Sequence, residues 1–266
     1  YGIDYETPLF EGWGTQSAVN LVGHSFGGAT TRLFLEILTN GCPEEVAAAK
    51  AAGVAPSPFF LGGKGSWVHS LTAIAAPHNG TTFIEANSDF TKLAADLATG
   101  AAKALGLSSL KGVYDFQLEQ FGIYKDPNET VLETLQRVFS TDFMSHNDNA
   151  FLDLTIDRSL EINDGIGIEP NVYYFSYAGD KTCQSALTGE RTSAADMTPL
   201  FVPFANQMCS YYNQTTAGGF QIDKSWAPND GLVNTVSALY PTNSAGKCLT
   251  KSGQTGYIPV SYTHLR

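Results

Sequence analysis

Ser25 lies in a glycine-rich turn whose residue types suit nucleophilic catalysis. The turn reads Gly23-His24-Ser25-Phe26-Gly27, a Gly-x-Ser-x-Gly pattern. In such a strand-to-helix turn the serine hydroxyl is held above the sheet, where it can attack an acyl carbon. Backbone N–H groups at the start of the following helix, first that of Phe26, can stabilise the oxyanion that forms. We therefore predict Ser25 as an acyl-transfer nucleophile and Phe26 as an oxyanion donor.

The segments on either side of this turn must position the serine. The run at 18–22 is short and largely apolar, with β-branched Val19 and Val22, which predicts a buried parallel strand. Apolar residues then recur at helical spacing over 29–38, and Gly41 stands where a left-handed helix end belongs. We expect side chains at Gly23 and Gly27 to collide across the turn. The alternative is a glycine-rich turn that carries an idle serine.

Composition and charge limit the class of protein. The chain has 266 residues, 43% of them hydrophobic, which is enough for one α/β domain with a substantial core. No apolar run reaches the length of about 18 residues that a membrane span needs. With a net charge of -11 and only 15 Lys and Arg, the chain lacks the basic face that a nucleic-acid partner requires.

Four cysteines, Cys42, Cys183, Cys209 and Cys248, occur without a Cys-x-x-Cys pair and without a histidine at ligand spacing. This spacing argues against a metal site built on cysteine. Sequence alone leaves two alternatives open, which are two disulfides and four free thiols.

Two aspartates compete for the role of catalytic acid. Asp180 follows a predicted strand over 171–177, and Asp230 follows a turn rich in proline and asparagine. Spacing alone does not choose between them. His78 follows a second predicted strand over 67–74 and is a candidate base. Because Pro precedes it and Asn-Gly follows it, a structural role in a rigid turn is the simpler interpretation.

Helical patterns occupy much of the remaining chain. The stretch at 83–107, rich in alanine and leucine, predicts either a packed surface helix or an amphipathic helix that is buried only part of the time. Further helices are predicted over 43–53, 127–139 and 149–162.

Four blocks of sequence carry a resemblance to a known family. They are residues 23–28, 75–82, 114–122 and 226–235, in this order. The same blocks occur in the same order in the large secreted lipases of Bacillus, Geobacillus and Staphylococcus, and the resemblance covers the chain from Ala18 to about Tyr240. It implies an α/β-hydrolase fold, with a mostly parallel sheet, helices on both faces, and a helical lid insertion around 83–165 in a single domain of residues 1–266.

The same resemblance implies an activity and a setting. It points to a triacylglycerol lipase that works at a lipid–water interface with a Ser-His-Asp triad, and it selects Asp230 over Asp180 as the acid. It also implies a protein secreted to the extracellular space. A short-chain esterase, a thioesterase and a non-catalytic lipid-binding protein of hydrolase fold are the alternatives.

Metal sites are implied only by the resemblance to this family. The chemistry itself needs no cofactor, but the family holds structural calcium and zinc. Asp148 matches a position that supplies a carboxylate to zinc, and Asp196 matches a position whose backbone carbonyl binds calcium.

The two ends of the chain depart from the family pattern. The sequence starts at Tyr1 without Met or a leader, and the family places its second oxyanion donor and its zinc histidines well before the nucleophile, so we expect truncation at both ends. His264 is the histidine that follows Asp230, but it stands in Thr-His-Leu where the family has Asp-His-Leu or Asp-His-Met. Residues 259–266 resemble translated adapter sequence and are expected to be non-native. The base is therefore either His264 or a histidine outside this chain.

Overall fold

The computed structural model divides the chain into two compact units. The first comprises residues 1–83 and 154–266, and the second comprises residues 84–153. The structure describes residues 12–87, 95, 98–100, 102–103, 106, 119, 122–124, 126–139 and 149–246, together with the backbone of 257–262.

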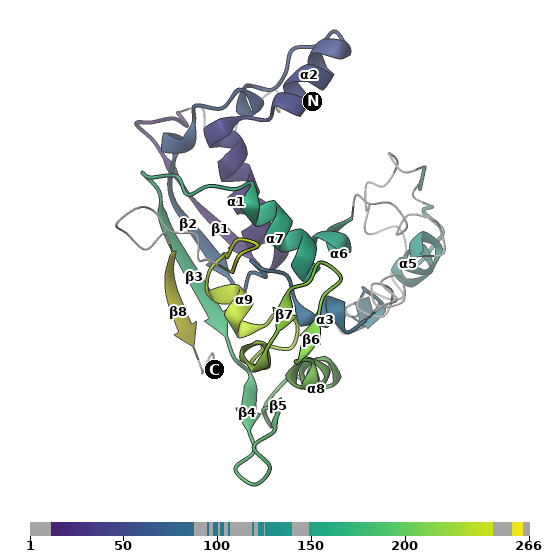
Figure 1. Ribbon diagram of the computed structural model, residues 1–266. Helices are drawn as coiled ribbons and strands as arrows, with labels where there is room; N and C mark the ends of the chain where they lie inside the picture. Colours follow the sequence, from purple (N-terminus) through teal and green to yellow (C-terminus); the bar gives the residue numbers. More distant parts are fainter. Residues whose placement is uncertain are drawn as a thin grey trace. The chain divides into compact units, whose positions relative to one another are not determined.

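A parallel sheet of four strands forms the centre of the first unit (Figure 1). Its strand order is β1-β2-β3-β8, and each neighbouring pair is parallel. The carboxyl ends of all four strands therefore lie at one edge of the sheet, which is where parallel α/β sheets place their functional loops. The strands are β1 (Val19–His24), β2 (Val68–Ile74), β3 (Tyr173–Gly179) and β8 (Tyr257–Tyr262).

β1 differs from the buried strand that the sequence predicts. Within the described residues it pairs with β2 alone, and Asn20, Val22 and His24 are exposed, Val22 to 62%. Helix α1 (Phe26–Asn40) packs on β1 and β2. The strand is thus half-buried, and the apolar run at 18–22 overstates how much of it is covered.

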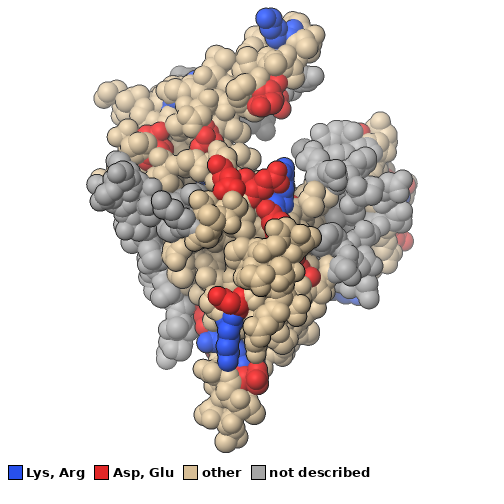
Figure 2. Space-filling model, viewed as in Figure 1, with Lys and Arg blue, Asp and Glu red and all other residues tan. Residues whose placement is uncertain are grey.

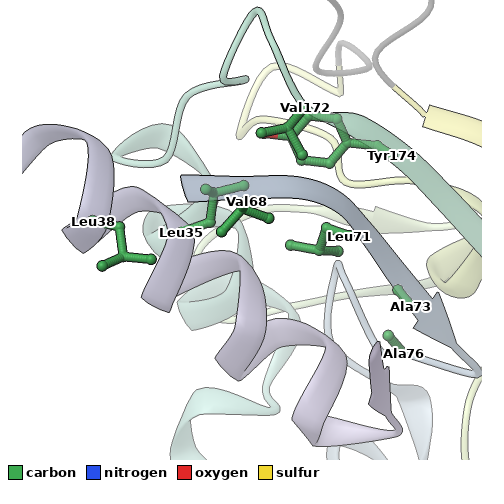
Figure 3. Packing of buried hydrophobic residues seen from close by; sticks show 8 residues of the cluster. All are labelled: Leu35, Leu38, Val68, Leu71, Ala73, Ala76, Val172 and Tyr174. Carbon is green, nitrogen blue, oxygen red and sulfur yellow. The ribbon is translucent and has the colours of Figure 1, made fainter. Parts of the chain in front are cut away.

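The core of this unit lies between α1 and the sheet (Figure 3). Leu35 and Leu38 of α1 are almost fully buried and pack with Leu71 of β2. Burying each such leucine contributes roughly 2 kcal/mol. The complete cluster consists of Leu35, Leu38, Val68, Leu71, Ala73, Ala76, Val172 and Tyr174.

Shorter elements surround the sheet. Helix α7 (Ile156–Asp164) buries Ile156 and Leu160 against Ile222 and Trp226. The other elements of this unit are α2 (Pro43–Ala51), η1 (Pro58–Leu61), η2 (Gly65–Trp67), α3 (Thr82–Glu85), whose last residues enter the second unit, α8 (Val202–Ser210), η5 (Lys224–Trp226), α9 (Thr235–Leu239), the hairpin β4 (Thr182–Gln184) with β5 (Arg191–Ser193), and the hairpin β6 (Gln214–Thr215) with β7 (Gln221–Ile222).

The second unit contains α5 (Val131–Phe139) and α6 (Ala150–Asp153). A capping box begins α5, because Thr130 Oγ1 accepts from the Glu133 amide at 3.2 Å and Glu133 Oε2 accepts from the Thr130 amide at 2.8 Å. The predicted helix over 149–162 is broken where Thr155 caps α7.

This unit covers less of the chain than the expected lid at 83–165. Residues 154–165, with α7, belong to the first unit. Most of the alanine-rich stretch at 88–107 lies outside the described residues, so the lid remains a prediction.

The predicted α/β class is confirmed by the parallel sheet and its helices. Every helix in the described part of the chain is too short or too polar to span a lipid bilayer. The sequence predicts truncation at both ends and a non-native tail at residues 259–266. The structure has a strand at 257–262, while the residues after it, including His264, lie outside those described.

Candidate active site

Ser25 occupies a strained backbone conformation between β1 and α1. Its φ is 55° and its ψ is -132°, a region that costs of order 1–3 kcal/mol for a residue other than glycine. Two hydrogen bonds hold it there: the Ser25 amide donates to the Ile74 carbonyl at 2.8 Å, and the Ser25 carbonyl accepts from the Gly28 amide at 2.9 Å. The sharp turn that the sequence predicts is present.

The glycines of this turn have different roles from those expected. A Cβ at Gly23 would lie 2.3 Å from the Gly27 carbonyl oxygen, and a Cβ at Gly28 would lie 2.4 Å from the Cβ of Ala76. A Cβ at Gly27 would meet nothing within 4 Å. The expected collision at Gly27 is therefore wrong, because its Cβ would point into open space. Gly23 and Gly28 are the positions where close packing requires glycine.

The backbone amide of Phe26 is available at the start of α1. It donates no hydrogen bond to any residue that the structure describes. The N-terminus of a helix carries a partial positive charge of about half a unit, which favours an oxyanion there. The predicted oxyanion donor thus lies next to Ser25 with its N–H uncommitted.

Asp230 lies beside the carboxyl end of β3, since a Cβ at Gly179 would be 3.6 Å from the Asp230 Cβ. One carboxylate oxygen, Oδ1, accepts from the amides of Val233 at 2.8 Å and Leu232 at 3.0 Å. The other oxygen accepts nothing from the described residues. Burial raises the pKa of Asp230 above its ordinary value, opposed in part by these amides and by the charge of His24.

A buried asparagine ties the Asp230 turn to the loop after β2. Asn234 is fully buried, and its Oδ1 accepts from the Thr82 amide at 2.8 Å. Its Nδ2 donates to the Thr82 hydroxyl at 2.7 Å and to the Trp226 carbonyl at 2.5 Å. The Thr81 hydroxyl also donates to the Leu232 carbonyl at 2.6 Å. Sequence reasoning missed this link, although an asparagine within Gly-Leu-Val-Asn-Thr was a visible signal.

Asn229 shapes the same turn from inside. It is fully buried, and its Oδ1 accepts from the Gly231 amide at 2.9 Å. Its Nδ2 donates to the carbonyls of Ala227 at 2.9 Å and Ala205 at 3.3 Å. The turn that carries Asp230 is therefore held by the side-chain amides of Asn229 and Asn234, both of which donate and accept hydrogen bonds.

Asp180, the rival acid, is committed to the β4–β5 hairpin. Its Oδ1 accepts from the Thr182 amide at 2.9 Å, and its Oδ2 accepts from Arg191 Nη1 at the same distance. Both oxygens are engaged, whereas Asp230 keeps one oxygen open. This geometry favours Asp230 as the acid.

His78 is buried and lies away from solvent. Its Nε2 is 3.3 Å from the Ser176 hydroxyl, and its backbone carbonyl accepts from Asn163 at 2.9 Å. Burial, together with the charge of Arg32, lowers the pKa of His78 well below its usual value. A neutral, enclosed imidazole fits the turn-forming role rather than that of a base.

Two of the remaining histidines, His69 and His24, lie in the described part of the chain. His69 is exposed on β2 with its ring edge-on to Tyr173. His24 is exposed beside Ser25 on β1. His146 and His264 lie outside the described residues.

The described residues do not fit a zinc site. Asp148 lies outside them, and no three His, Cys, Asp or Glu side chains gather around a common point in the described ranges. At the expected calcium position, the Asp196 carboxylate pairs with Lys181 Nζ at 2.6 Å and is largely exposed. Calcium through the Asp196 carbonyl and zinc through Asp148 stay predictions, and no step below depends on either.

Of the four cysteines, Cys42, Cys183 and Cys209 are described, and all three are free thiols. Cys209 is buried in α8, where its sulfur accepts from Asn229 at 3.5 Å. These three positions agree with the free-thiol alternative. Cys248 lies outside the described residues.

The chain resembles named lipases along almost its whole length. It is 32% identical to the lipase of Staphylococcus epidermidis and to lipase 1 of Staphylococcus aureus, and each match covers 99% of this chain. The chain spans only 36% and 37% of the length of these two relatives.

Solved structures give the same result. EstA from Clostridium botulinum superposes with a TM-score of 0.80 at 30% identity, over 95% of this chain and 59% of that one. Lipase 1 from Pelosinus fermentans has a TM-score of 0.71 at 35% identity, over 92% and 64%. The family model described as "Lipase-like, C-terminal domain" matches residues 1–264. With the strained serine turn and the parallel sheet, this match shows that the chain belongs to the lipase-like C-terminal domain family.

Proposed function

We propose that this chain carries the catalytic residues of a carboxylic ester hydrolase, specifically a triacylglycerol lipase. The observation that carries the proposal is the backbone of Ser25, held at φ 55° between a parallel strand and a helix whose first amide is uncommitted. A packed turn with no function has no need of such strain, because an ordinary conformation would be more stable.

In the proposed reaction, Ser25 Oγ attacks the ester carbonyl carbon while a histidine accepts the hydroxyl proton. The Phe26 N–H donates to the oxyanion of the tetrahedral intermediate. Collapse expels the alcohol, which takes the proton from the histidine, and water then hydrolyses the acyl-serine by the same steps. The open oxygen of Asp230 accepts the Nδ1–H of the histidine and so fixes its tautomer.

The base is a histidine that follows Asp230 in the chain. His264 comes two residues after β8, whose carboxyl end belongs to the edge of the sheet that carries Ser25. The alternative is a histidine outside this chain, with residues 259–266 non-native. His264→Ala separates the two. If His264 is the base, the unmodified chain is labelled at Ser25 and the variant is not; if the base lies outside this chain, neither protein is labelled above the Ser25→Ala background.

Long-chain acylglycerols at a lipid–water interface are the proposed substrates, and the extracellular space is the proposed location. Support comes from the relatives, which are named lipases and an EstA. A short-chain esterase or a thioesterase is the alternative within the same chemistry. Hydrolysis rates on tributyrin, a long-chain triglyceride emulsion and an acyl thioester rank these substrates directly.

A fluorophosphonate probe tests the chemistry itself, because it labels only an activated serine. We expect labelling at Ser25 that is lost in Ser25→Ala and kept in Ser66→Ala, an exposed serine remote in sequence from the turn. Asp230→Asn should reduce the labelling rate by about 10⁴, and Asp180→Asn should leave it nearly unchanged. A folded version that is extended at both ends and still gives no label at Ser25 would favour the non-catalytic lipid-binding alternative.

A further inference from the structure

A cavity of about 300 Å³ lies beside the second half of α1, within the first unit. This volume is at the lower end of the range for small-molecule sites, roughly 300–1,000 Å³. Tyr174 places the cavity near the amino end of β3, whereas the serine site lies at the carboxyl ends of the strands. The lining residues on which the argument depends are Arg32, Glu36, Thr39, Gly167, Ile168 and Glu169.

Arg32 is a buried cation with unused hydrogen-bonding capacity. Its side chain is only 4% exposed, and Nη1 donates to Asn163 Oδ1 at 2.8 Å. Nη2 is buried and has no hydrogen-bond partner among the residues that the structure describes. Because a charged group with a buried, unpaired N–H costs more free energy than a neutral one, a ligand acceptor at Nη2 would be strongly favoured.

Thr39 adds a second unused group to the same cavity. Its Oγ1 is buried and finds no hydrogen-bond partner in the described part of the chain. A Cβ at Gly65 would lie 2.7 Å from this oxygen and 2.6 Å from Glu169 Oε2, so both oxygens approach the same point. Glu169 Oε2 accepts no hydrogen bond from the described residues, while Oε1 accepts from the Asn171 amide at 3.3 Å.

The charges around the cavity decide the class of ligand. Glu36 and Glu169 contribute two negative charges against the single positive charge of Arg32, and the face shown in Figure 2 carries more acidic than basic surface. A further anion would meet net repulsion. A neutral molecule with several hydroxyl groups can accept from Arg32 Nη2 and donate to Glu169 Oε2. Ile168 and its apolar neighbours can contact the carbon skeleton.

We propose that this cavity binds a small neutral polyol of about the size of glycerol. The site is independent of the ester chemistry proposed for Ser25, and its test does not use enzyme activity.

Glycerol is the probe, and the measurement is an NMR titration of the ¹⁵N-labelled full chain. The amide of Gly167, which donates to Glu36 at 2.9 Å, should shift with saturation as glycerol is added. Thr39→Val removes one hydroxyl without a change in shape and should weaken binding about fivefold, as expected for one hydrogen bond. Thr31→Val is the matched control, because Thr31 is on α1 but does not line the cavity.

Three results would overturn the proposal. The first is a Gly167 shift that stays linear in glycerol, which means that water alone fills the cavity. The second is saturation by sodium butyrate and not by glycerol, which means that the site takes a carboxylate. The third is equal glycerol affinity in Thr39→Val and the unmodified chain, with both folded by circular dichroism.

Discussion

The amide of Thr82 donates to Asn234 Oδ1 at 2.8 Å, and this bond joins the loop after β2 to the turn that carries Asp230. The Asn234 side chain is fully buried, and its amide also donates to the Trp226 carbonyl, so one residue links the segment after β2, the end of η5 and the Asp230 turn. Asn234 is therefore a positioning residue for the proposed acid.

Asn234→Leu should destabilise the protein by about 3 kcal/mol, since the Thr82 amide and the Trp226 carbonyl would be left buried and unpaired. Urea denaturation followed by circular dichroism measures the change. The exposed Asn171→Leu serves as control and should change the free energy of unfolding by less than about 0.5 kcal/mol. Similar losses for both variants would contradict the role of Asn234.

The glycines of the serine turn should respond differently to alanine. Gly23→Ala should cost about 3 kcal/mol or prevent folding, because its Cβ would overlap the Gly27 carbonyl. Gly27→Ala should stabilise the protein by roughly 0.5–1 kcal/mol, since the new Cβ meets open space in a helix. Thermal unfolding compares the two variants. If Gly27→Ala is as damaging as Gly23→Ala, the geometry of this turn is wrong.

Asp230→Asn should raise the stability of the protein at pH 7 while it abolishes ester hydrolysis. Burial raises the pKa of Asp230 above the ordinary aspartate value of 3.8, so the folded state binds this proton more readily than the unfolded state. The stability that the neutral carboxyl contributes is fully present below pH 3.8 and is lost as the pH rises through the folded-state pKa. The difference in free energy of unfolding between Asp230→Asn and the unmodified protein should therefore shrink as the pH falls towards 4. Denaturant titrations of both proteins at several pH values measure it. A pH-independent difference would contradict the raised pKa.

Thiol reactivity should separate Cys183 from Cys209. Cys183 is exposed, whereas Cys209 is buried and its pKa is raised, chiefly by desolvation. In the folded protein, iodoacetamide should alkylate Cys183 at least a hundredfold faster than Cys209. Cys209 should react readily only after denaturation. Peptide mapping by mass spectrometry reads both sites in one sample. Equal rates in the folded state would show that α8 does not protect Cys209.

Much of the fold near the serine follows from local sequence. The helix after Ser25 and its end at Gly41, and strands close to 67–74 and 171–177, appear as expected because their periodicity is strong and their ends carry clear signals. The exposure of alternate residues in β1 did not follow, because burial of a strand depends on its neighbours.

The candidate site was only partly visible in the sequence. Ser25 could be identified because a turn motif is local. The preference for Asp230 over Asp180 needed either a family resemblance or the structure, because it depends on whether Arg191 occupies the carboxylate. Asn234 could not be assigned a role, since its partners at Thr82 and Trp226 come together only after folding.

Because the Ser25 amide donates to the Ile74 carbonyl, the reactivity of Ser25 also reports the order in which β1, α1 and β2 come together during folding. One of the two bonds that hold the strained serine conformation comes from Gly28 of α1 and the other from the end of β2, so the restraint is complete only once β2 is in place. During refolding, the serine should therefore become reactive only after β2 docks, later than the appearance of helical circular dichroism. A stopped-flow experiment with a fluorogenic phosphonate would measure when Ser25 becomes reactive, and this time reports the formation of the β1–β2 pair.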